Sequence, residues 1–173
     1  MSRFLLQMAG LPGSGKTALA AAIGRCTAAV VIDKDVIMAG AMRAGVSEEI
    51  SGAAAYEVGL ELAASLLAAG HDVILDSPAN FVVIREKGRA IACAAGARYY
   101  IIECVVSREL AEQRLTCREP LHSLHPNTLA GLDLDFERPG TAPLSEPRLE
   151  LDSSLPTETN LARALEYIGH DPG

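Results

Sequence analysis

One short run constrains this chain more than any other feature: Gly10, Leu11, Pro12, Gly13, Ser14, Gly15, Lys16 and Thr17 fit the pattern G-x-x-x-x-G-K-[ST] in full. An apolar segment, residues 4–8, precedes the run, and alanine-rich helical sequence, residues 16–25, follows it. Glycines let the backbone turn several N–H groups toward one anion, in dihedral angles that residues with a Cβ resist. A helix that begins at Lys16 points its positive end at the same anion. The run therefore predicts a phosphate-binding loop between a first strand and a first helix.

Two side chains at the end of this loop carry chemistry. In such loops the lysine reaches the β- and γ-phosphates of a nucleotide, and the Ser/Thr hydroxyl ligates Mg²⁺. Lys16 is therefore a predicted catalytic and nucleotide-binding residue, and Thr17 is a predicted metal ligand. Because the γ-phosphoryl charge of ATP needs screening, the predicted cofactors are ATP and Mg²⁺.

Carboxylates follow the next two apolar strands. Asp33 and Asp35 follow strand 28–32, which we expect beside the first strand, and Asp76 ends strand 73–75. Ligands of open α/β sheets bind at the carboxyl ends of the strands. Asp35 is the favoured general base for an acceptor hydroxyl, although either aspartate of the pair could instead cap the next helix. Asp76 is predicted to hold Mg²⁺, usually through water.

Two arginines lie before an irregular segment. Arg114 and Arg118 are four residues apart on a predicted helix that begins after Ser107, so they share one face. Residues 119–147 then contain five prolines and little periodicity, which is typical of a lid. Arg118 is predicted to clamp phosphate charge in the transition state, and Arg114 to lie against the adenine. The alternative is a solvated helix face.

Strands and helices alternate along the whole chain. The predicted strands are 4–8, 28–32, 73–75, 99–106 and 149–151. They are nearly all apolar rather than alternating, as a sheet covered on both faces requires. The sequence therefore predicts an α/β, three-layer fold with a five-stranded parallel sheet. A length of 173 residues fits a single domain, 1–173, with a lid insertion at about 119–147.

Composition excludes some classes of protein. A net charge of −7, 4% aromatic residues and no tryptophan argue against a nucleic-acid partner. The four cysteines form no Cys-x-x-Cys pair, and we expect them to be buried in a reducing compartment. No segment has the length of a signal sequence or a membrane span, which predicts a cytoplasmic protein without a membrane partner. The oligomeric state is left open.

Five segments together resemble the small P-loop kinase group, which includes chloramphenicol phosphotransferases, zeta-toxin-type kinases, the kinase domain of polynucleotide 5′-kinases and AAA-type ATP-binding kinases. The segments are GLPGSGKT, IDKD, VILDSPA, RLTCRE and LELDSSLPTETNLARAL. The resemblance implies a five-stranded parallel sheet with a small lid. It also implies that Asp35 is the general base, that Arg114 and Arg118 are lid arginines, and that residues 149–153 lie near the adenine.

One position departs from this group and bears on the acceptor. Several relatives have a basic residue three positions after the base, where this chain has Met38, although Arg43 could substitute. With the acidic net charge, this favours a small, uncharged or cationic acceptor. The predicted function is phosphoryl transfer from ATP to a small-molecule hydroxyl. The alternatives are a nucleotide or polynucleotide 5′-hydroxyl kinase and an ATP-binding switch without phosphotransfer.

Overall fold

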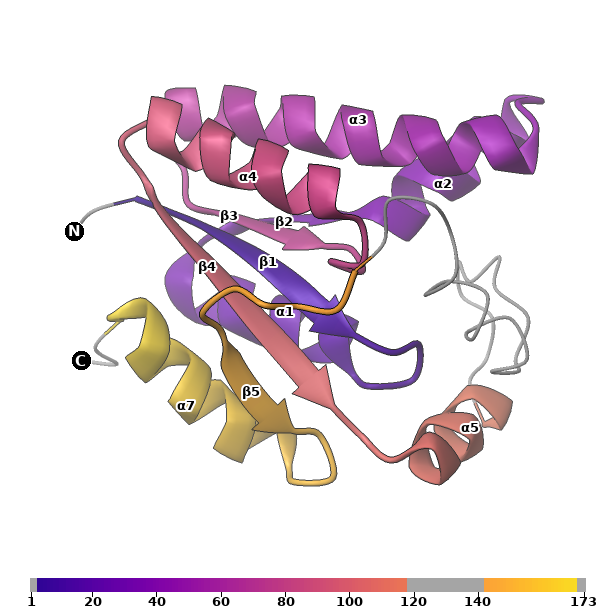
Figure 1. Cartoon of the computed structure of the whole chain (residues 1–173), viewed down its shortest axis with the longest axis vertical. Coiled ribbons are helices and arrows are strands. Elements are labelled where there is room, and N and C mark those ends of the chain that lie inside the picture. Colours follow the sequence, from indigo (N-terminus) through magenta and orange to yellow (C-terminus); the bar gives the residue numbers. More distant parts are fainter. Residues whose placement is uncertain (1–2, 118–141, 171–173) are drawn as a thin grey trace.

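A computed structural model describes residues 3–117 and 142–170 (Figure 1). Its sheet has five strands in the order β2-β3-β1-β4-β5, and every pair of neighbours is parallel. The strands are β1 Phe4–Gly10, β2 Val30–Asp33, β3 Val73–Asp76, β4 Arg98–Val105 and β5 Leu149–Asp152. The predicted α/β class with a five-stranded parallel sheet is confirmed.

Helices cover both faces of this sheet (Figure 1). They are α1 Lys16–Thr27, α2 Lys34–Arg43, α3 Glu48–Ala68, α4 Val82–Ala94, α5 Arg108–Thr116 and α7 Thr157–Ile168. Helices α1 and α7 pack on one face, and α3 and α4 pack on the other. Helix α5 lies beyond the carboxyl end of β4.

Strand β1, at the centre of the sheet, shows why the strand sequences are continuously apolar. Leu6 and Met8 of β1 belong to the core beneath α1 and α7, whereas Leu5 belongs to the core beneath α3 and α4. All three are fully buried. Because helices cover both faces, residues that point to opposite sides are equally removed from water.

The order of the strands corrects one expectation. Strand β2 pairs with β3 and lies at the edge of the sheet, so β3, not β2, is the neighbour of β1 on that side. The prediction that the strand before Asp35 lies beside the phosphate loop strand is therefore wrong. The register nevertheless sets Asp33 directly opposite Asp76, so the acidic strand ends still meet at one edge of the sheet. Local patterns indicate strands but do not encode which strands pair.

Two helices, α5 and α3, begin directly after a serine residue. The Ser107 hydroxyl accepts a hydrogen bond from the Leu110 N–H and caps α5. Ser47 is the N-cap residue of α3, without a side-chain hydrogen bond. The second strand begins two residues later than predicted, because Ala28, with a φ of 57°, ends α1 in the left-handed region.

The cysteines differ from expectation. Only Cys104 is buried, while Cys26, Cys93 and Cys117 are exposed, and all four are free thiols. The three exposed cysteines lie near helix ends or on a helix surface, which the sequence pattern alone does not separate from core positions.

Helix α3 is the one helix among the described residues that is long and apolar enough to span a membrane, by length and composition alone. In the fold it contributes Leu60, Ala63 and Leu67 to the core beneath α4. Packing against the sheet accounts for only part of its apolar character, since a third of the apolar window is buried and Ile50, Val58 and Leu62 are exposed.

Candidate functional site

The loop between β1 and α1 is shaped by its glycines. Gly10, Gly13 and Gly15 have φ values of 127°, 79° and 85°, which residues with a Cβ avoid. A Cβ on Gly13 would lie 2.6 Å from the carbonyl oxygen of Ala111, and a Cβ on Gly10 would overlap that of Cys104. The loop is therefore held tightly between β4 and α5, in the conformation that the sequence run predicts.

The lysine and threonine that follow the loop start α1 at the carboxyl end of the sheet. Lys16 Nζ donates a hydrogen bond of 3.0 Å to the carbonyl oxygen of Leu11, within the loop itself. The Thr17 side chain hydrogen-bonds to Asp76 at the end of β3. The structure thus brings together the two predicted metal-binding residues from segments that are 59 positions apart in the sequence.

Asp76 lies in an environment suited to a cation. Its carboxylate is buried, and this burial raises its pKa above the ordinary value of 3.8. The Thr17 hydrogen bond and the Lys16 charge act against this rise, whereas the charges of Asp33 and Asp35 add to it. Hard oxygen ligands of this kind suit Mg²⁺, for which water and phosphate oxygens supply the other ligands. Within residues 3–117 and 142–170, no three His, Cys, Asp or Glu side chains lie close enough to hold a metal ion by themselves.

Replacing Asp76 by asparagine should stabilise the nucleotide-free protein while weakening its binding of Mg²⁺ and nucleotide. The pKa of Asp76 is higher in the folded protein than the ordinary value of 3.8. Ionisation of Asp76 therefore lowers the free energy of unfolding as the pH rises from 3.8 through the pKa of the folded protein. The Asp76→Asn substitution removes that cost, so the melting temperature of the variant should exceed that of wild type at about pH 8 more than at about pH 4.5. Thermal melts at the two values measure this difference. A variant less stable at both would contradict it.

Asp33 and Asp35, which follow strand β2, were each considered as a helix cap or as a general base. Asp33 Oδ1 accepts hydrogen bonds from the N–H groups of Asp35 and Val36 and so caps α2. The Asp35 carboxylate lies 3.0 Å from Lys34 Nζ, and its charge raises the pKa of Asp76. Asp35 therefore lies near the predicted metal-binding residues, and its role as general base stays a prediction.

Sequence reasoning missed a buried cation beside Asp35. Lys34 is only 7% exposed, and its Nζ lies 5.3 Å from the centroid of the Tyr56 ring. Its Nζ also contacts the sulfur of Met38 at 3.8 Å, and Met38 is itself buried. Arg43 is at the far end of α2, about 12 Å along the helix axis from Asp35. A lysine between two aspartates was the available signal.

A pocket of about 250 Å³ opens on the other side of the loop. It lies between the loop, α5 and the turn between β5 and α7. Its lining residues are Ser14, Gly15, Ala18, Leu19, Cys104, Arg114, Ser153, Leu155, Thr157 and Asn160. This is the side of the loop on which the resemblance implied an adenine.

Arg114 closes one wall of this pocket. Its guanidinium donates hydrogen bonds to the carbonyl oxygens of Gly13 at 3.5 Å and Ser153 at 2.6 Å. The arginine thus ties α5 to both the phosphate loop and the turn after β5, and its predicted place against the adenine stays a prediction. Arg118 and residues 118–141 of the predicted lid lie outside the described residues.

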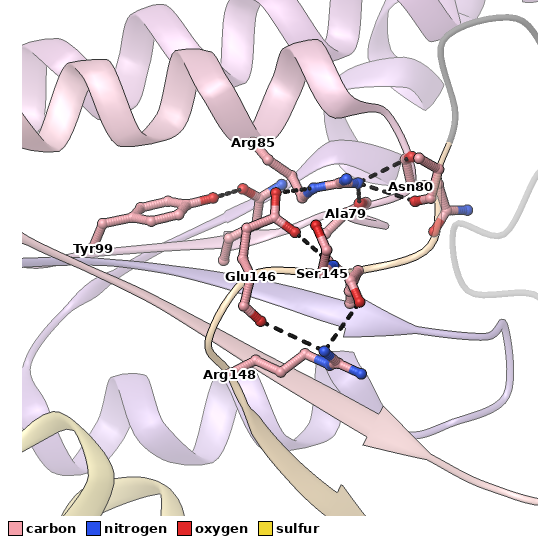
Figure 2. Close-up of polar contacts among 10 residues, drawn as sticks. Ala79, Asn80, Arg85, Tyr99, Ser145, Glu146 and Arg148 are labelled. Carbon is pink, nitrogen blue, oxygen red and sulfur yellow. Dashed lines mark hydrogen bonds and ion pairs between the residues drawn. The ribbon is translucent and has the colours of Figure 1, made fainter.

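A second buried arginine holds the loop that follows Asp76. Arg85 of α4 is 2% exposed and reaches the carbonyl oxygens of Ala79 and Asn80 at 2.7 and 3.2 Å. Figure 2 shows the same guanidinium reaching Glu146, whose carboxylate accepts a hydrogen bond of 2.7 Å. Arg85 lies three and seven residues before the buried Gly88 and Ala92, a helical spacing that its charge outweighs in a reading of the sequence alone.

The segment before β5 is fixed to the sheet through this arginine. Arg85 also donates a hydrogen bond to the carbonyl oxygen of Ala142. The N–H of Ala142 in turn donates to the carbonyl oxygen of Asn80. Leu144 packs on β1 and β4, where the segment crosses the sheet (Figure 1). Arg148 pairs with Glu103 and Glu150 at its other end. The residues after Asp76 and the residues before β5 therefore form one hydrogen-bonded unit.

Removing the Arg85 side chain should destabilise the fold strongly. Burial raises the pKa of Glu146, but the hydrogen bonds from Arg85 and the backbone outweigh it and hold the pKa below 4.5, so Glu146 stays charged. Arg85→Met leaves this carboxylate and the loop carbonyls without their donor, at a cost of about 3 kcal/mol. Glu146→Gln keeps an acceptor for Arg85 and should cost about 1 kcal/mol. Urea unfolding of both variants measures the two costs; equal small effects would contradict the assignment.

These features define a class of protein. A glycine loop between the central strand and α1, with acidic strand ends beside it, is the nucleotide site of a P-loop fold. The chain belongs to the AAA domain family, whose profile matches residues 5–127. The predicted resemblance to the small P-loop kinase group is thereby confirmed.

Solved structures share the fold over nearly the whole chain. A sugar kinase from Janibacter sp. HTCC2649 is 20% identical, with a TM-score of 0.70 and coverage of 99% of this chain and 97% of that one. Mycobacterium tuberculosis APS kinase CysC, in complex with AMPPNP and APS, is 17% identical, with a TM-score of 0.71 and coverage of 97% and 98%. A gluconokinase from Sinorhizobium meliloti 1021 is 20% identical, with a TM-score of 0.63 and coverage of 95% and 90%. No curated protein matches the sequence significantly.

Proposed function

We propose that this protein is an ATP-dependent phosphotransferase that moves the γ-phosphoryl group onto a hydroxyl of a small molecule. The observation that carries the proposal is the meeting of Lys16, Thr17 and Asp76 at one edge of the sheet, with Asp35 beside them. On the other side of the loop lies the pocket closed by Arg114. These features support the proposal of a phosphate cradle, a cation site, a carboxylate base and a place for a nucleobase.

The chain's own residues would divide the work of an in-line transfer. The loop N–H groups and Lys16 hold the β- and γ-phosphates, and Thr17 and Asp76 hold Mg²⁺, which when bound neutralises phosphate charge. Asp35 orients the acceptor hydroxyl and accepts its proton. The acceptor oxygen then bonds to the γ-phosphorus as the bond to the bridging oxygen of ADP breaks. Arg118 is proposed to stabilise the charge of the transition state.

The proposal extends to the acceptor and the compartment. The related structures include kinases named for sugar, gluconate and APS, which supports a small molecule as the acceptor. A net charge of −7 and the burial of Met38 argue against a nucleic-acid 5′ end. We propose a cytoplasmic location, since the exposed thiols of Cys26, Cys93 and Cys117 fit a reducing compartment.

A coupled assay of ADP release tests the reaction directly. Purified protein with ATP and Mg²⁺ is given aminoglycoside, sugar, nucleoside and RNA acceptors in turn. Release stimulated by a sugar or aminoglycoside supports the proposal, whereas stimulation by nucleosides or RNA alone favours a 5′-hydroxyl kinase. Nucleotide binding without stimulation by any of these acceptors favours the ATP-binding switch.

A further inference from the structure

A buried arginine holds the loop that begins at Asp76 and connects β3 to α4. Arg85, in the first turn of α4, turns back and donates hydrogen bonds of 2.7 and 3.2 Å to the carbonyl oxygens of Ala79 and Asn80 (Figure 2). Ala79 is fully buried, and the ring of Pro78 fixes the φ angle just before it. Ala79 is three residues after Asp76, at most about 11 Å along the chain. The arginine therefore fixes the backbone close to the Asp76 carboxylate.

Stability alone is a weak reason for a charge in this position. The Arg85 side chain is 2% exposed, and that of its partner Glu146 is 16% exposed. Taking two charges out of water is costly, and apolar side chains of similar volume often stabilise a fold equally well or better. In some folds a buried ion pair instead specifies one arrangement of the chain, because each donor needs its own acceptor. The arrangement that Arg85 specifies is that of the loop after Asp76.

The Asp76 carboxylate lies where electrostatic repulsion acts on it. Asp33 is directly opposite in the strand register, and the charges of Asp33 and Asp35 both act on Asp76. Like charges repel, so the three carboxylates tend to move apart when no cation lies between them. A metal ligand that is held in place beforehand binds its ion more tightly, because less ordering remains to be done on binding. A rigid loop after Asp76 supplies this support.

We propose that Arg85 is a positioning residue for Mg²⁺: by fixing the loop after Asp76, it holds that carboxylate in place for the ion. The inference rests on the proposed function, which assigns Asp76 to Mg²⁺. Arg85 acts through the backbone and needs no contact with the ion. Its guanidinium also bonds to Ala142 and Glu146, so the segment that leads into β5 is part of the same support.

Two variants separate this role from a purely structural one. Arg85→Met/Glu146→Leu removes the whole ion pair, so it should recover much of the stability that Arg85→Met loses. Arg85→Lys keeps a positive charge for Glu146 but lacks the planar fork that reaches both loop carbonyl oxygens. The control is Arg3→Met. Arg3 also donates to two backbone carbonyl oxygens, those of Leu67 and Ala95, but it lies beside the start of β1, at the opposite edge of the sheet from Asp76.

Calorimetric titration with the non-hydrolysable analogue AMPPNP, in Mg²⁺ and in EDTA, measures the effect on each protein once circular dichroism shows that it is folded. The ratio of the two affinities gives what Mg²⁺ adds to binding. Loss of a residue that supports a metal ligand typically lowers metal affinity about 10–100-fold, so the ratio should fall by about 10-fold in both Arg85 variants. The affinity in EDTA, and the ratio in Arg3→Met, should match wild type.

The outcomes separate this inference from the proposed function. An unchanged ratio in Arg85→Met/Glu146→Leu would overturn the inference, and Arg85 would then serve stability alone. Arg85→Lys decides in the same way if the double variant does not fold. An equal fall in Arg3→Met would also overturn it, because the effect would then follow any loss of stability. These results leave the proposed phosphotransfer intact. If wild type binds AMPPNP equally in Mg²⁺ and in EDTA, the cation site of the proposed function fails together with the role of Arg85.

Discussion

Lys16→Ala should remove phosphoryl transfer and weaken ATP binding without unfolding the domain. In the nucleotide-free protein the Lys16 ammonium bonds to the carbonyl oxygen of Leu11. On this reading it moves to the β- and γ-phosphates when ATP binds, and it meets the charge that develops in the transition state. Loss of one such donor typically costs about 10²–10³-fold in kcat. Titration with ATP and the coupled assay measure the two effects.

A matched control is available for this variant. Lys87 pairs with Glu57 on the surface, where the two side chains are 44% and 59% exposed. An exposed pair of this kind contributes about 0–1 kcal/mol, so Lys87→Ala should leave both transfer and ATP affinity unchanged. Both proteins should melt close to wild type. Unchanged affinity and turnover in Lys16→Ala would remove the assignment of the phosphate loop.

Asp35→Asn should lower kcat by about 10²–10⁴-fold, because it removes the carboxylate oxygen that we propose as the base for the acceptor hydroxyl. The substitution keeps the size of the side chain but removes the carboxylate charge that pairs with Lys34. ATP affinity should barely change, since Lys16, Thr17 and the loop N–H groups still hold the phosphates. Steady-state kinetics with saturating ATP and an acceptor identified in the panel assay measure this split between turnover and affinity.

Asp33→Asn is the matched control for this prediction. Asp33 is committed to the N-terminus of α2 through the N–H groups of Asp35 and Val36, and asparagine caps helices equally well. Its kcat should therefore remain close to wild type. If Asp33→Asn loses transfer while Asp35→Asn keeps it, the base is Asp33. If neither variant affects a demonstrated transfer, a base on this segment is excluded.

Local sequence predicted the parts of the site that depend on neighbours in the chain. The glycine run placed the loop correctly because its dihedral angles are set residue by residue, and Ser107 was recognised as a cap because a hydroxyl before a helix bonds to its first turn. Asp76 was found because an apolar strand ends there. In each case the physical cause lies within a few residues.

Features that depend on distant contacts could not be found in this way. The position of β2 at the sheet edge is fixed by pairing with a strand about 40 residues away. Arg85 and Lys34 carry charges and look like surface residues, yet partners from other elements allow them to be buried.

The strand order has a consequence for how such a protein can diversify. With β1 at the centre, the pocket beside Arg114 is built from the phosphate loop, α1, β4, α5, the turn after β5 and α7. In contrast, Asp35, Lys34 and the residues around them come from α2, α3, β3 and α4. The two halves share little beyond the phosphate loop and the strand ends. If the proposed function holds, substitutions on α2, α3 and α4 should alter the choice of acceptor while the nucleotide stays the same.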